Sequence, residues 1–311
     1  MTYVYLLAGE NLELAEDELK GFLKSQEVDP DVERQGRLAI VNEEVMEGQL
    51  RRLALTHEVS SVVEEGSIEK MDVEYVPENS FSVRAIDINN EGHNTARIET
   101  KVGTKLSDGN NTVDLENPDE ELKVYLTEDS YYLSRLVLDI DRGLYQKRVN
   151  QKRPFSSPVS LDPVLARVLV NLSGVKPGEN LVDPFCGTGG ILIEAGLCGI
   201  GVHGVDVKKE MVEGSRQNLE EYGIIVHDIR EGLVNDLSGI FDKTFDAVVT
   251  DLPYGGASKV EGSPVQDFLD KAPEVCDGRI VFMSDRNELD GLKPEHEVYV
   301  HRNLTRYIYI I

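Results

Sequence analysis

Four aspartates in the second half of the chain each follow an apolar run that is typical of a buried strand. They are Asp183 in NLVD, Asp206 in GVHGVD, Asp228 in IIVHD and Asp251 in FDAVVTD. Carboxylates accept hydrogen bonds from hydroxyl and amino groups and balance positive charge. A single acid at a strand end often does no more than face water. Three in successive strand and helix units, one of them inside a glycine loop, favour a ligand site at the carboxyl edge of a parallel sheet.

The loop DPFCGTGG, residues 183–190, follows the first of these runs and precedes a helical pattern. Gly187 and Gly189 allow close approach of the backbone to a ligand. The loop lacks the G-x-G-x-x-G pattern and the lysine that phosphate-binding loops require. Its acid, Asp183, would repel a pyrophosphate but suits a cationic ligand with an ammonium and a sulfonium group. We therefore predict S-adenosylmethionine as the cofactor.

The next two acids suit other parts of that cofactor. Asp206 lies about twenty residues after the loop, where an acid accepts hydrogen bonds from ribose hydroxyls. Asp228 follows the third apolar run, where it would accept a hydrogen bond from the adenine amino group. The cofactor-binding residues that we predict are Asp183, Pro184, Phe185, Gly187, Gly189, Asp206, Val207, Asp228 and Ile229.

Cysteine and histidine chemistry is a weaker alternative. Cys186 lies inside the glycine loop, but no adjacent base in the sequence would activate it as a nucleophile. His203 and His227 lie beside the strand-end acids, where local packing explains them more simply than a role as bases. The chain has three cysteines, too few and too widely spaced for a zinc site or a disulfide framework. We expect no metal.

The segment TDLPYGG, residues 250–256, completes a wider pattern with VDPFCGTGG and GVDVKKEMVEG. Together they resemble the class I S-adenosylmethionine-dependent methyltransferases that act on an exocyclic amino nitrogen. The D/N-P-P-Y/F signature of that group appears here as Asp251-Leu252-Pro253-Tyr254. The resemblance implies that Asp251 and the Leu252 carbonyl accept hydrogen bonds from the target amine and that Tyr254 stacks on the base.

Elementary chemistry agrees with these roles. The lone pair of an aryl amine is delocalised into the ring, so two acceptors that hold its hydrogens help the nitrogen to pyramidalise towards the methyl group. No strong base is needed, because a sulfonium is a good methyl donor and positioning can do most of the work. Leu252 stands where the signature usually has its first proline. The rigid φ of proline is lost there, so we expect a less rigid loop and an effect on rate.

The elements that must position these residues follow from hydrophobic periodicity. After residue 158, apolar strands alternate with amphipathic helices in 160–175, 191–199 and 209–223. This alternation predicts an α/β, doubly wound and mostly parallel sheet. With the resemblance above, it implies a Rossmann-like class I methyltransferase domain. The last segment, EVYVHRNLTRYIYI, predicts an antiparallel terminal hairpin.

The first half alternates strands and helices without a phosphate-binding loop, which predicts a small α/β unit with an antiparallel or mixed sheet. FSVRA, the helix that ends in KVGTKLSDG, and VDLENPDEELKVYL resemble the THUMP domain of RNA-modifying enzymes, preceded by a ferredoxin-like domain. The resemblance implies binding of the acceptor end of tRNA. The domains that we predict are 1–66 (ferredoxin-like), 67–146 (THUMP), 147–158 (basic linker) and 159–311 (methyltransferase).

Essentially the whole chain resembles the archaeal THUMP-domain tRNA (guanine(10)-N2)-methyltransferase and dimethyltransferase family. The resemblance implies methylation of the exocyclic N2 of guanosine at position 10, with tRNA bound through its acceptor end and D-arm region. An aryl amine has two hydrogens, so both mono- and dimethylation are open. Alternatives are the same chemistry at another tRNA guanosine such as position 6, adenine N6 or a protein glutamine as substrate, and a non-catalytic RNA-binding protein. Adenine and glutamine enzymes usually carry Asn at the position of Asp251.

The net charge of the chain opposes an RNA partner, whereas one basic segment favours it. The net charge of -25 argues superficially against a nucleic-acid partner, but residues 141–158 reverse the trend. A solvated linker is an equally good interpretation of this basic run. As a hypothesis, the global acidity suits a salty cytoplasm, where screening also mutes repulsion of RNA. The RNA-binding residues that we predict are Arg84, Arg142, Lys147, Arg148, Lys152, Arg153 and Phe155.

Composition also predicts the setting. Hydrophobic residues make up 40% and charged residues 29% of the chain, as in an ordinary globular protein. No apolar run approaches the roughly 20 residues of a membrane span, and the N-terminus lacks the pattern of a signal peptide. We expect a cytoplasmic protein without a membrane partner. A monomer is compatible with the sequence, which leaves the oligomeric state open.

Overall fold

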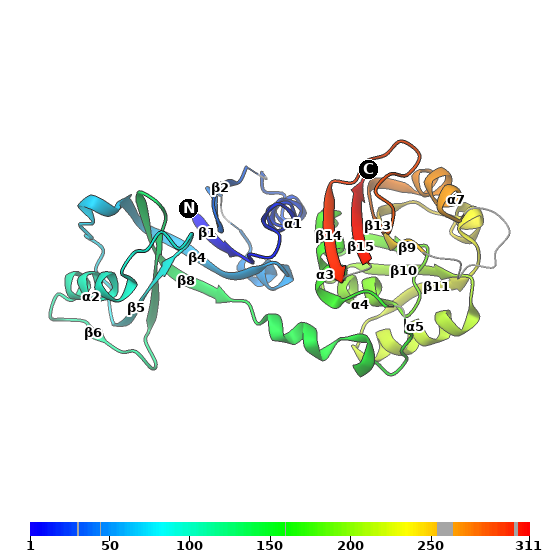
Figure 1. Cartoon of the computed structure of the whole chain (residues 1–311). Coiled ribbons are helices and arrows are strands. Elements are labelled where there is room, and N and C mark those ends of the chain that lie inside the picture. Colours follow the sequence, from blue (N-terminus) through cyan, green and yellow to red (C-terminus); the bar gives the residue numbers. More distant parts are fainter. Residues whose placement is uncertain (30, 44, 159, 254–263, 302–303) are drawn as a thin grey trace. The chain divides into compact units, whose positions relative to one another are not determined.

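The computed structural model describes residues 1–29, 31–43, 45–158, 160–253, 264–301 and 304–311. These residues form two compact units, each with a sheet of its own (Figure 1). The first unit comprises residues 1–16, 28–51 and 55–141, and the second comprises residues 17–27, 52–54 and 142–311.

The sheet of the first unit is mixed, with eight strands in the order β2-β3-β1-β4-β8-β7-β5-β6. Neighbours are antiparallel except that β5 runs parallel to both β6 and β7. β4 is the longest strand, because it pairs with β1 on one side and with β8 on the other. The strands are β1 (Tyr3–Leu7), β2 (Glu33–Gln35), β3 (Leu38–Val41), β4 (Thr56–Ser67), β5 (Ser80–Asp87), β6 (Thr112–Val113), β7 (Glu120–Leu126) and β8 (Ser130–Asp139).

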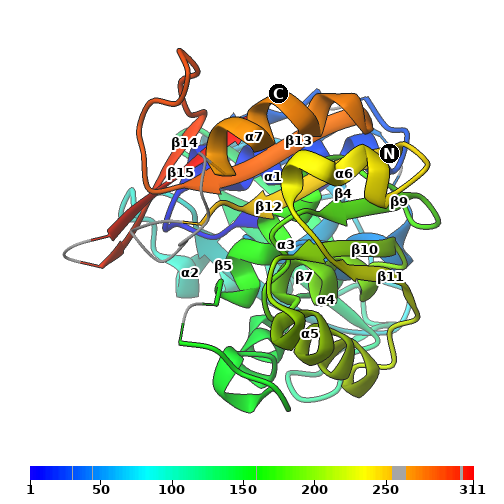
Figure 2. The same cartoon turned by 90° about the vertical axis from the view of Figure 1, so that its right-hand side faces the viewer.

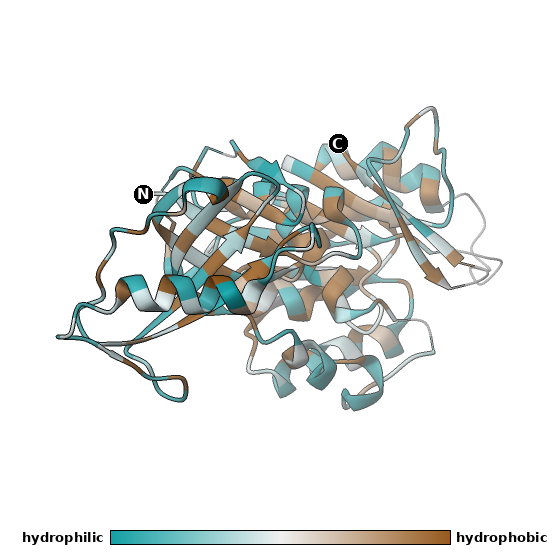
Figure 3. Ribbon diagram, turned by 60° about the vertical axis from the view of Figure 1, so that its left-hand side comes forward, coloured by the Kyte–Doolittle hydropathy of each residue, from teal (hydrophilic) through white to brown (hydrophobic). Residues whose placement is uncertain are grey.

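Helix α2 (Thr95–Leu106) covers the THUMP-like part of this sheet. It begins after Asn94, whose side chain accepts a hydrogen bond from the Arg97 amide and so caps the first turn. Val102 and Leu106 are buried against Phe81 and Leu122 of the neighbouring strands. Figure 3 shows hydrophobic stretches along the strands, and both hydrophilic and hydrophobic stretches along the helices. The predicted α/β unit with a mixed sheet is confirmed.

The sequence QLRRLALTHEVSSVVEEGS predicts a helix followed by a strand. The structure confirms the strand, but only a short 3-10 helix, η1 (Glu47–Arg52), precedes β4. β-branched residues from Thr56 onwards favour the strand, which leaves too few residues for a stable α-helix.

The sheet of the second unit has seven strands in the order β11-β10-β9-β12-β13-β15-β14. The first five are parallel, whereas β15 is antiparallel to both β13 and β14. The predicted doubly wound sheet with an antiparallel terminal hairpin is therefore confirmed. The strands are β9 (Asn180–Asp183), β10 (Gly201–Asp206), β11 (Val226–Glu231), β12 (Phe245–Asp251), β13 (Cys276–Ser284), β14 (His296–His301) and β15 (Leu304–Ile310).

Helices lie on both faces of this sheet, with α3, α4 and α5 on one side and α6 and α7 on the other (Figure 2). The first of them starts cleanly because Asp162 accepts a hydrogen bond from the Val164 amide and Pro163 occupies the first turn. The helices of this part of the chain are α3 (Pro163–Leu172), α4 (Gly190–Gly196), α5 (Lys209–Glu221), α6 (Leu237–Ile240) and α7 (Pro264–Lys271), and α1 (Leu12–Ser25) lies near the N-terminus.

An aromatic core holds α6 and α7 against the sheet. Phe268 of α7 packs edge-on against Phe282 of β13, and Phe282 stacks on Tyr309 of β15 with ring centroids 4.8 Å apart. Phe245 and Leu252, near the two ends of β12, belong to the same cluster. The terminal hairpin is thus part of the hydrophobic core and holds a fixed position beside β13.

Candidate active site

Two of the predicted acids, Asp183 and Asp251, end the adjacent parallel strands β9 and β12. Thr250 lies between them. Its Oγ1 donates a hydrogen bond of 2.6 Å to Oδ1 of Asp183, and its side chain is fully buried. The glycine loop after β9 and the D-L-P-Y segment after β12 therefore start side by side at the carboxyl edge of the sheet.

Asp183 is buried, with 2% of its surface exposed. Oδ1 also accepts a hydrogen bond of 3.0 Å from the Phe185 amide, which shapes the start of the loop. Burial raises the pKa of Asp183 to about 7, against the opposing effect of its two hydrogen bonds, and the nearby Asp251 and Asp206 raise it further. A cation placed beside Asp183 would relieve this penalty.

The glycine loop bends through two residues with positive φ, Gly187 at 50° and Gly189 at 79°. A Cβ on Gly189 would lie 2.4 Å from Oγ of Ser215 in α5, so a side chain does not fit there. A Cβ on Gly187 would meet only the Phe185 carbonyl oxygen at 3.9 Å, so the backbone at 187 faces open space. Cys186 is buried, and burial raises the pKa of its thiol well above the usual range, which suits a packing residue.

Asp206 ends β10 and faces the same loop. Oδ2 accepts a hydrogen bond of 3.0 Å from the Gly187 amide, and Oδ1 accepts one of 2.8 Å from the Lys208 amide. Each carboxylate oxygen keeps a further lone pair for a hydroxyl group. Burial raises the pKa of this half-buried acid. The exposed Val207 follows directly, at the predicted edge of the cofactor site.

These residues fit the predicted cofactor. Three acids with pKa values raised by burial, Asp183, Asp206 and Asp251, lie around a loop whose backbone is open at Gly187. A cationic ligand with hydroxyl groups matches this set, whereas a pyrophosphate would be repelled by it. Phe185, half-buried beside Phe268 with ring centroids 6.1 Å apart, provides an apolar wall.

Asp228 does not lie where the sequence pattern placed it. The expectation that the third strand ends at this residue is wrong, because β11 runs on to Glu231. Asp228 lies mid-strand in register with His203, and its carboxylate forms an ion pair of 2.5 Å with Arg230. Glu231, exposed and in register with Asp206, is the acid at the strand end.

The error has a physical reason. β11 is the edge strand of the sheet, where polar and charged residues alternate with apolar ones, so the apolar run stopped short of the strand. Asp228 also borders a cavity of about 510 Å³ between α5 and β11. None of Asp183, Asp206 and Asp251 lines that cavity, and Ile229, also predicted to bind the cofactor, is fully buried.

His203 packs in the core. It is buried between the rings of Phe241 and Phe245, with Nε2 2.8 Å from Nζ of Lys243. The packing interpretation of this histidine agrees with that environment.

The D-L-P-Y segment begins at the end of β12. Burial raises the pKa of Asp251 to about 6, while the Arg306 guanidinium acts in the opposite direction. The Leu252 amide donates a hydrogen bond of 2.8 Å to the Met283 carbonyl, and the Leu252 side chain is buried in the aromatic core. A proline at this position could not donate that bond, so Leu252 gains from the neighbouring strand a restraint that offsets the loss of proline. Pro253 is exposed, and Tyr254 lies outside the described residues.

Arg306 of β15 was not among the predicted residues. Its Nη2 forms an ion pair with Oδ1 of Asp251, and only 4% of its side chain is exposed. The two residues are far apart in sequence, and only the pairing of the terminal hairpin with β13 brings them together. A buried arginine in an otherwise apolar strand, LTRYIYI, was the one signal that could have drawn attention to it.

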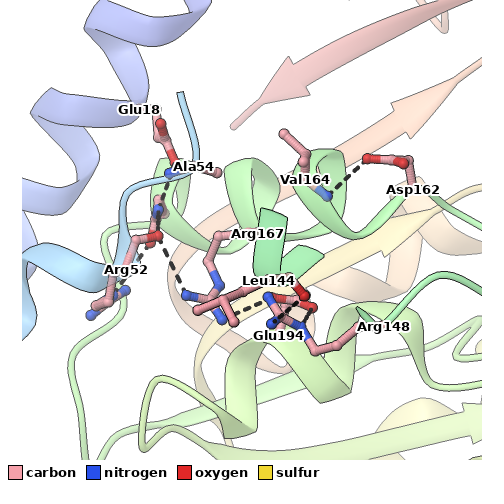
Figure 4. Close-up of polar contacts among 10 residues, drawn as sticks. Glu18, Arg52, Ala54, Leu144, Arg148, Asp162, Val164, Arg167 and Glu194 are labelled. Atoms are coloured by element: carbon pink, nitrogen blue, oxygen red, sulfur yellow. Dashed lines mark hydrogen bonds and ion pairs between the residues drawn. The ribbon is translucent and has the colours of Figure 1, made fainter. Parts of the chain in front are cut away.

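The basic segment is partly folded into the second unit. Arg148 forms a 2.7 Å ion pair with the fully buried Glu194 of α4, which also binds Arg167 of α3 at 2.8 Å (Figure 4). Arg153 is buried, and its Nε donates to the Arg148 carbonyl at 2.8 Å. These contacts do not favour the predicted role of Arg148 and Arg153 in RNA binding.

Phe155 lies against α5, where a Cβ on Gly214 would come within 2.1 Å of its ring. The remaining predicted RNA contacts are better placed for a partner. Lys147 and Lys152 are exposed on the 3-10 helices η3 (Arg142–Lys147) and η4 (Asn150–Lys152), and Arg84 is exposed on β5 of the first unit. Arg142 is half-buried.

Two further findings concern metals and membranes. In the part of the chain that the structure describes, no three His, Cys, Asp or Glu side chains are grouped so that they could hold a metal ion. Among the described helices, none is both long enough and apolar enough to span a membrane.

Known proteins show the same two parts. Residues 62–135 match the THUMP domain, and residues 150–289 match the family described as "RMKL-like, methyltransferase domain". Over its full length, the chain is 34% identical to the tRNA (guanine(10)-N2)-dimethyltransferase of Methanothermobacter thermautotrophicus, of which 99% is covered. The chain belongs to the family of archaeal tRNA (guanine(10)-N2)-dimethyltransferases. The enzyme of the same name from Pyrococcus abyssi is 32% identical, with 100% of this chain and 99% of that protein covered.

Solved structures share the fold of this family member. TrmN from Thermus thermophilus has a TM-score of 0.55 and 20% identity, over 100% of this chain and 99% of that chain. The structure of SMU.472 complexed with SAH has a TM-score of 0.50 and 16% identity, over 99% and 97% of the two chains. The predicted resemblance to the guanine(10)-N2 family and the predicted α/β class are both confirmed.

Proposed function

We propose that this chain transfers methyl groups from S-adenosylmethionine to the exocyclic N2 of guanosine at position 10 in tRNA. One observation carries the proposal furthest. Asp251 and the Leu252 carbonyl, the expected acceptors of the amine, lie beside the glycine loop of Asp183 in a member of the guanine(10)-N2 family. The acceptors and the cofactor loop are thus joined at one edge of one sheet.

Residues of the loop would hold the cofactor. Asp183 and the open backbone at Gly187 would bind the methionine part, with Phe185 as an apolar wall. Asp206 would bind the ribose, and Glu231 joins Asp228 as a candidate for the adenine side because it stands at the strand end. When bound, S-adenosylmethionine supplies an electrophilic methyl group on a sulfonium sulfur.

Asp251 and the Leu252 carbonyl would orient the guanine amine. The cofactor would supply a methyl group whose bonding electron pair stays with sulfur, and the guanine nitrogen would lose one proton after the transfer. We propose that the Asp251 carboxylate accepts this proton, and a pKa of about 6 would allow its return to water at neutral pH. Because the first product keeps one N–H, the same groups can orient it for a second transfer.

The tRNA would meet both units. The THUMP-like part of the first unit would hold the acceptor end, and Arg84, Arg142, Lys147 and Lys152 would contact backbone phosphates. A flipped guanosine would then stack on Tyr254. We retain the division into 1–66, 67–146, 147–158 and 159–311 as our proposal for the domains, and we propose a monomer as the acting form.

One experiment tests donor, base, atom and site together. The protein is incubated with methyl-labelled S-adenosylmethionine and tRNA transcripts, and the product nucleosides are analysed. We expect N2-methyl and N2,N2-dimethyl guanosine in the intact transcript and no label when the guanosine at position 10 alone is replaced. Label that survives this replacement and disappears when the guanosine at position 6 is replaced would assign the other site.

A further inference from the structure

The terminal hairpin brings one side chain to the acid of the D-L-P-Y segment. Asp251 is in register with Met283 of β13, and Met283 is in register with Ile308 of β15. Side chains in register across neighbouring strands lie on one face of a sheet, and so do residues two apart in a strand. Arg306 therefore projects from the same face as Asp251.

The distance between the strands suits an arginine. β12 and β15 are separated only by β13, so their backbones lie roughly 10 Å apart. The last pair between β13 and β15 joins Ser284 to Tyr307, and Arg306 lies just beyond it. Its side chain can thus reach past the end of β13 to the Asp251 carboxylate, and the ion pair between Nη2 and Oδ1 shows that it does.

The two side chains of the Arg306–Asp251 ion pair differ in their exposure. The Arg306 side chain is 4% exposed, whereas the Asp251 side chain is 19% exposed. The bond to Arg306 engages Oδ1, and within the described residues no hydrogen bond to Oδ2 is found. One end of the ion pair is therefore anchored in the core, and the other reaches the carboxyl edge where the substrate amine would be held.

Other charged groups near Asp251 do not stabilise its ionised form. Asp285, which follows β13, adds like charge, and Asp183 at the end of β9 is a second buried acid on the other side of Thr250. Burial and Asp285 act against ionisation of Asp251, and Asp251 in turn raises the pKa of Asp183. Within the described residues, Arg306 is the cation that lowers the pKa of Asp251.

We propose that Arg306 is a positioning residue for methyl transfer, which holds Oδ1 of Asp251 so that the carboxylate stays ionised and presents Oδ2 to the amine. The inference rests on the proposed function and deepens it. It assigns the terminal hairpin a task beyond packing, since the hairpin carries the counter-ion of the acid that orients the substrate.

The test compares the full-length chain with Arg306→Met and Arg306→Lys. The first removes the charge, and the second keeps it. Single-turnover methyl transfer to the tRNA transcript is measured between pH 5 and pH 9, with the affinity for S-adenosylmethionine and the melting temperature measured in parallel. Arg279→Met is the matched control, because Arg279 lies on β13 and bonds the Leu172 carbonyl instead of an acid.

We expect Arg306→Met to lower the rate at pH 6.5 by about threefold or more and to recover much of it at pH 9. The midpoint of the acidic limb should rise by about 1 pH unit or more, the size of effect that a nearby opposite charge has on a carboxyl group. Arg306→Lys and Arg279→Met should keep the midpoint of the wild type. A rate that falls by one factor at every pH, with an unmoved midpoint, would overturn the proposal and leave Arg306 a packing residue.

A second readout does not depend on methyl transfer. The carboxyl carbon of Asp251 is followed by NMR titration of carboxyl-labelled protein, with Asp251→Asn to assign the signal. Arg306→Met should raise this pKa, and an unchanged value would contradict the proposal even if the tRNA assay showed no activity. Absence of transfer by the wild type would instead overturn the proposed function, so the two failures are distinguishable.

Discussion

Thr250 donates a 2.6 Å hydrogen bond to Oδ1 of Asp183 and thereby ties the strand that carries Asp251 to the strand that carries the glycine loop. The hydroxyl is buried, and it also favours the ionised form of Asp183. Asp183 and Asp251, the proposed cofactor and substrate acids, are thus linked by this side chain as well as by the pairing of β9 with β12.

Thr250→Val keeps the shape of this side chain and removes its donor. We expect the free energy of unfolding to fall by about 1–2 kcal/mol, because one buried hydrogen bond is lost. The pKa of Asp183 should rise, so binding of S-adenosylmethionine should need a higher pH. Calorimetric titration from pH 5.5 to 8.5 measures the shift. Thr244→Val, at an exposed site, should leave binding unchanged, and an equal effect of both variants would contradict this account.

Asp183→Asn should separate stability from binding. The pKa of Asp183 is raised from 3.8 to about 7, so the folded protein holds this proton more tightly than the unfolded chain does. The stability that this group contributes is complete below pH 3.8 and is lost as the pH rises through about 7. Asparagine does not titrate, so the free energy of unfolding of the variant should rise relative to that of the wild type over that range, by up to about 4 kcal/mol at pH 8. Binding of S-adenosylmethionine should be abolished.

Chemical unfolding at pH 4.5 and pH 8 measures this difference. The advantage of Asp183→Asn should be much larger at the higher pH. An advantage that is the same at both values would mean that burial does not penalise the ionised acid.

Leu252→Pro restores the usual signature but removes the amide that bonds the Met283 carbonyl. We expect no gain in rate and a loss of stability beyond that of Leu252→Ala, which removes the buried side chain but keeps the amide. Thermal melting and single-turnover rates of both variants measure this. A faster Leu252→Pro enzyme of unchanged stability would show that proline rigidity is what the loop lacks.

The basic segment should divide into two classes of residue. Lys147→Ala and Lys152→Ala should weaken tRNA binding and each lower the slope of log affinity against log salt by about 1, with little change in melting temperature. Arg148→Ala should instead destabilise the fold by about 1–3 kcal/mol, because the buried Glu194 loses one of the two arginines that pair with it in the described part of the chain. Filter binding at several salt concentrations, together with melting curves, tests the division. If Arg148→Ala alone altered the salt slope, the assignment of the two classes would be reversed.

Local patterns were enough to predict the parallel sheet, the terminal hairpin and the position of Asp183, Asp206 and Asp251 at strand ends. Each depends on residues that are close in sequence, such as the glycine loop directly after β9. The family resemblance added the guanine chemistry, and relatives that match the whole chain confirm the family.

Long-range contacts were beyond the reach of these patterns. Arg306 meets Asp251 only because β15 pairs with β13, and Arg148 meets Glu194 only because the basic segment folds against α4. Asp228 was misplaced for a different reason, since an edge strand need not stay apolar to its end. For Arg306 and Arg148, the partner that decides the role of the side chain lies on another element.

The most direct test of the central claim compares the wild type with Asp251→Ala on a tRNA transcript with methyl-labelled S-adenosylmethionine. The account predicts labelled N2-methylguanosine at position 10 with the wild type, and with the variant no transfer but retained cofactor binding. Transfer that persists in Asp251→Ala, or label on any atom other than guanine N2, would contradict it.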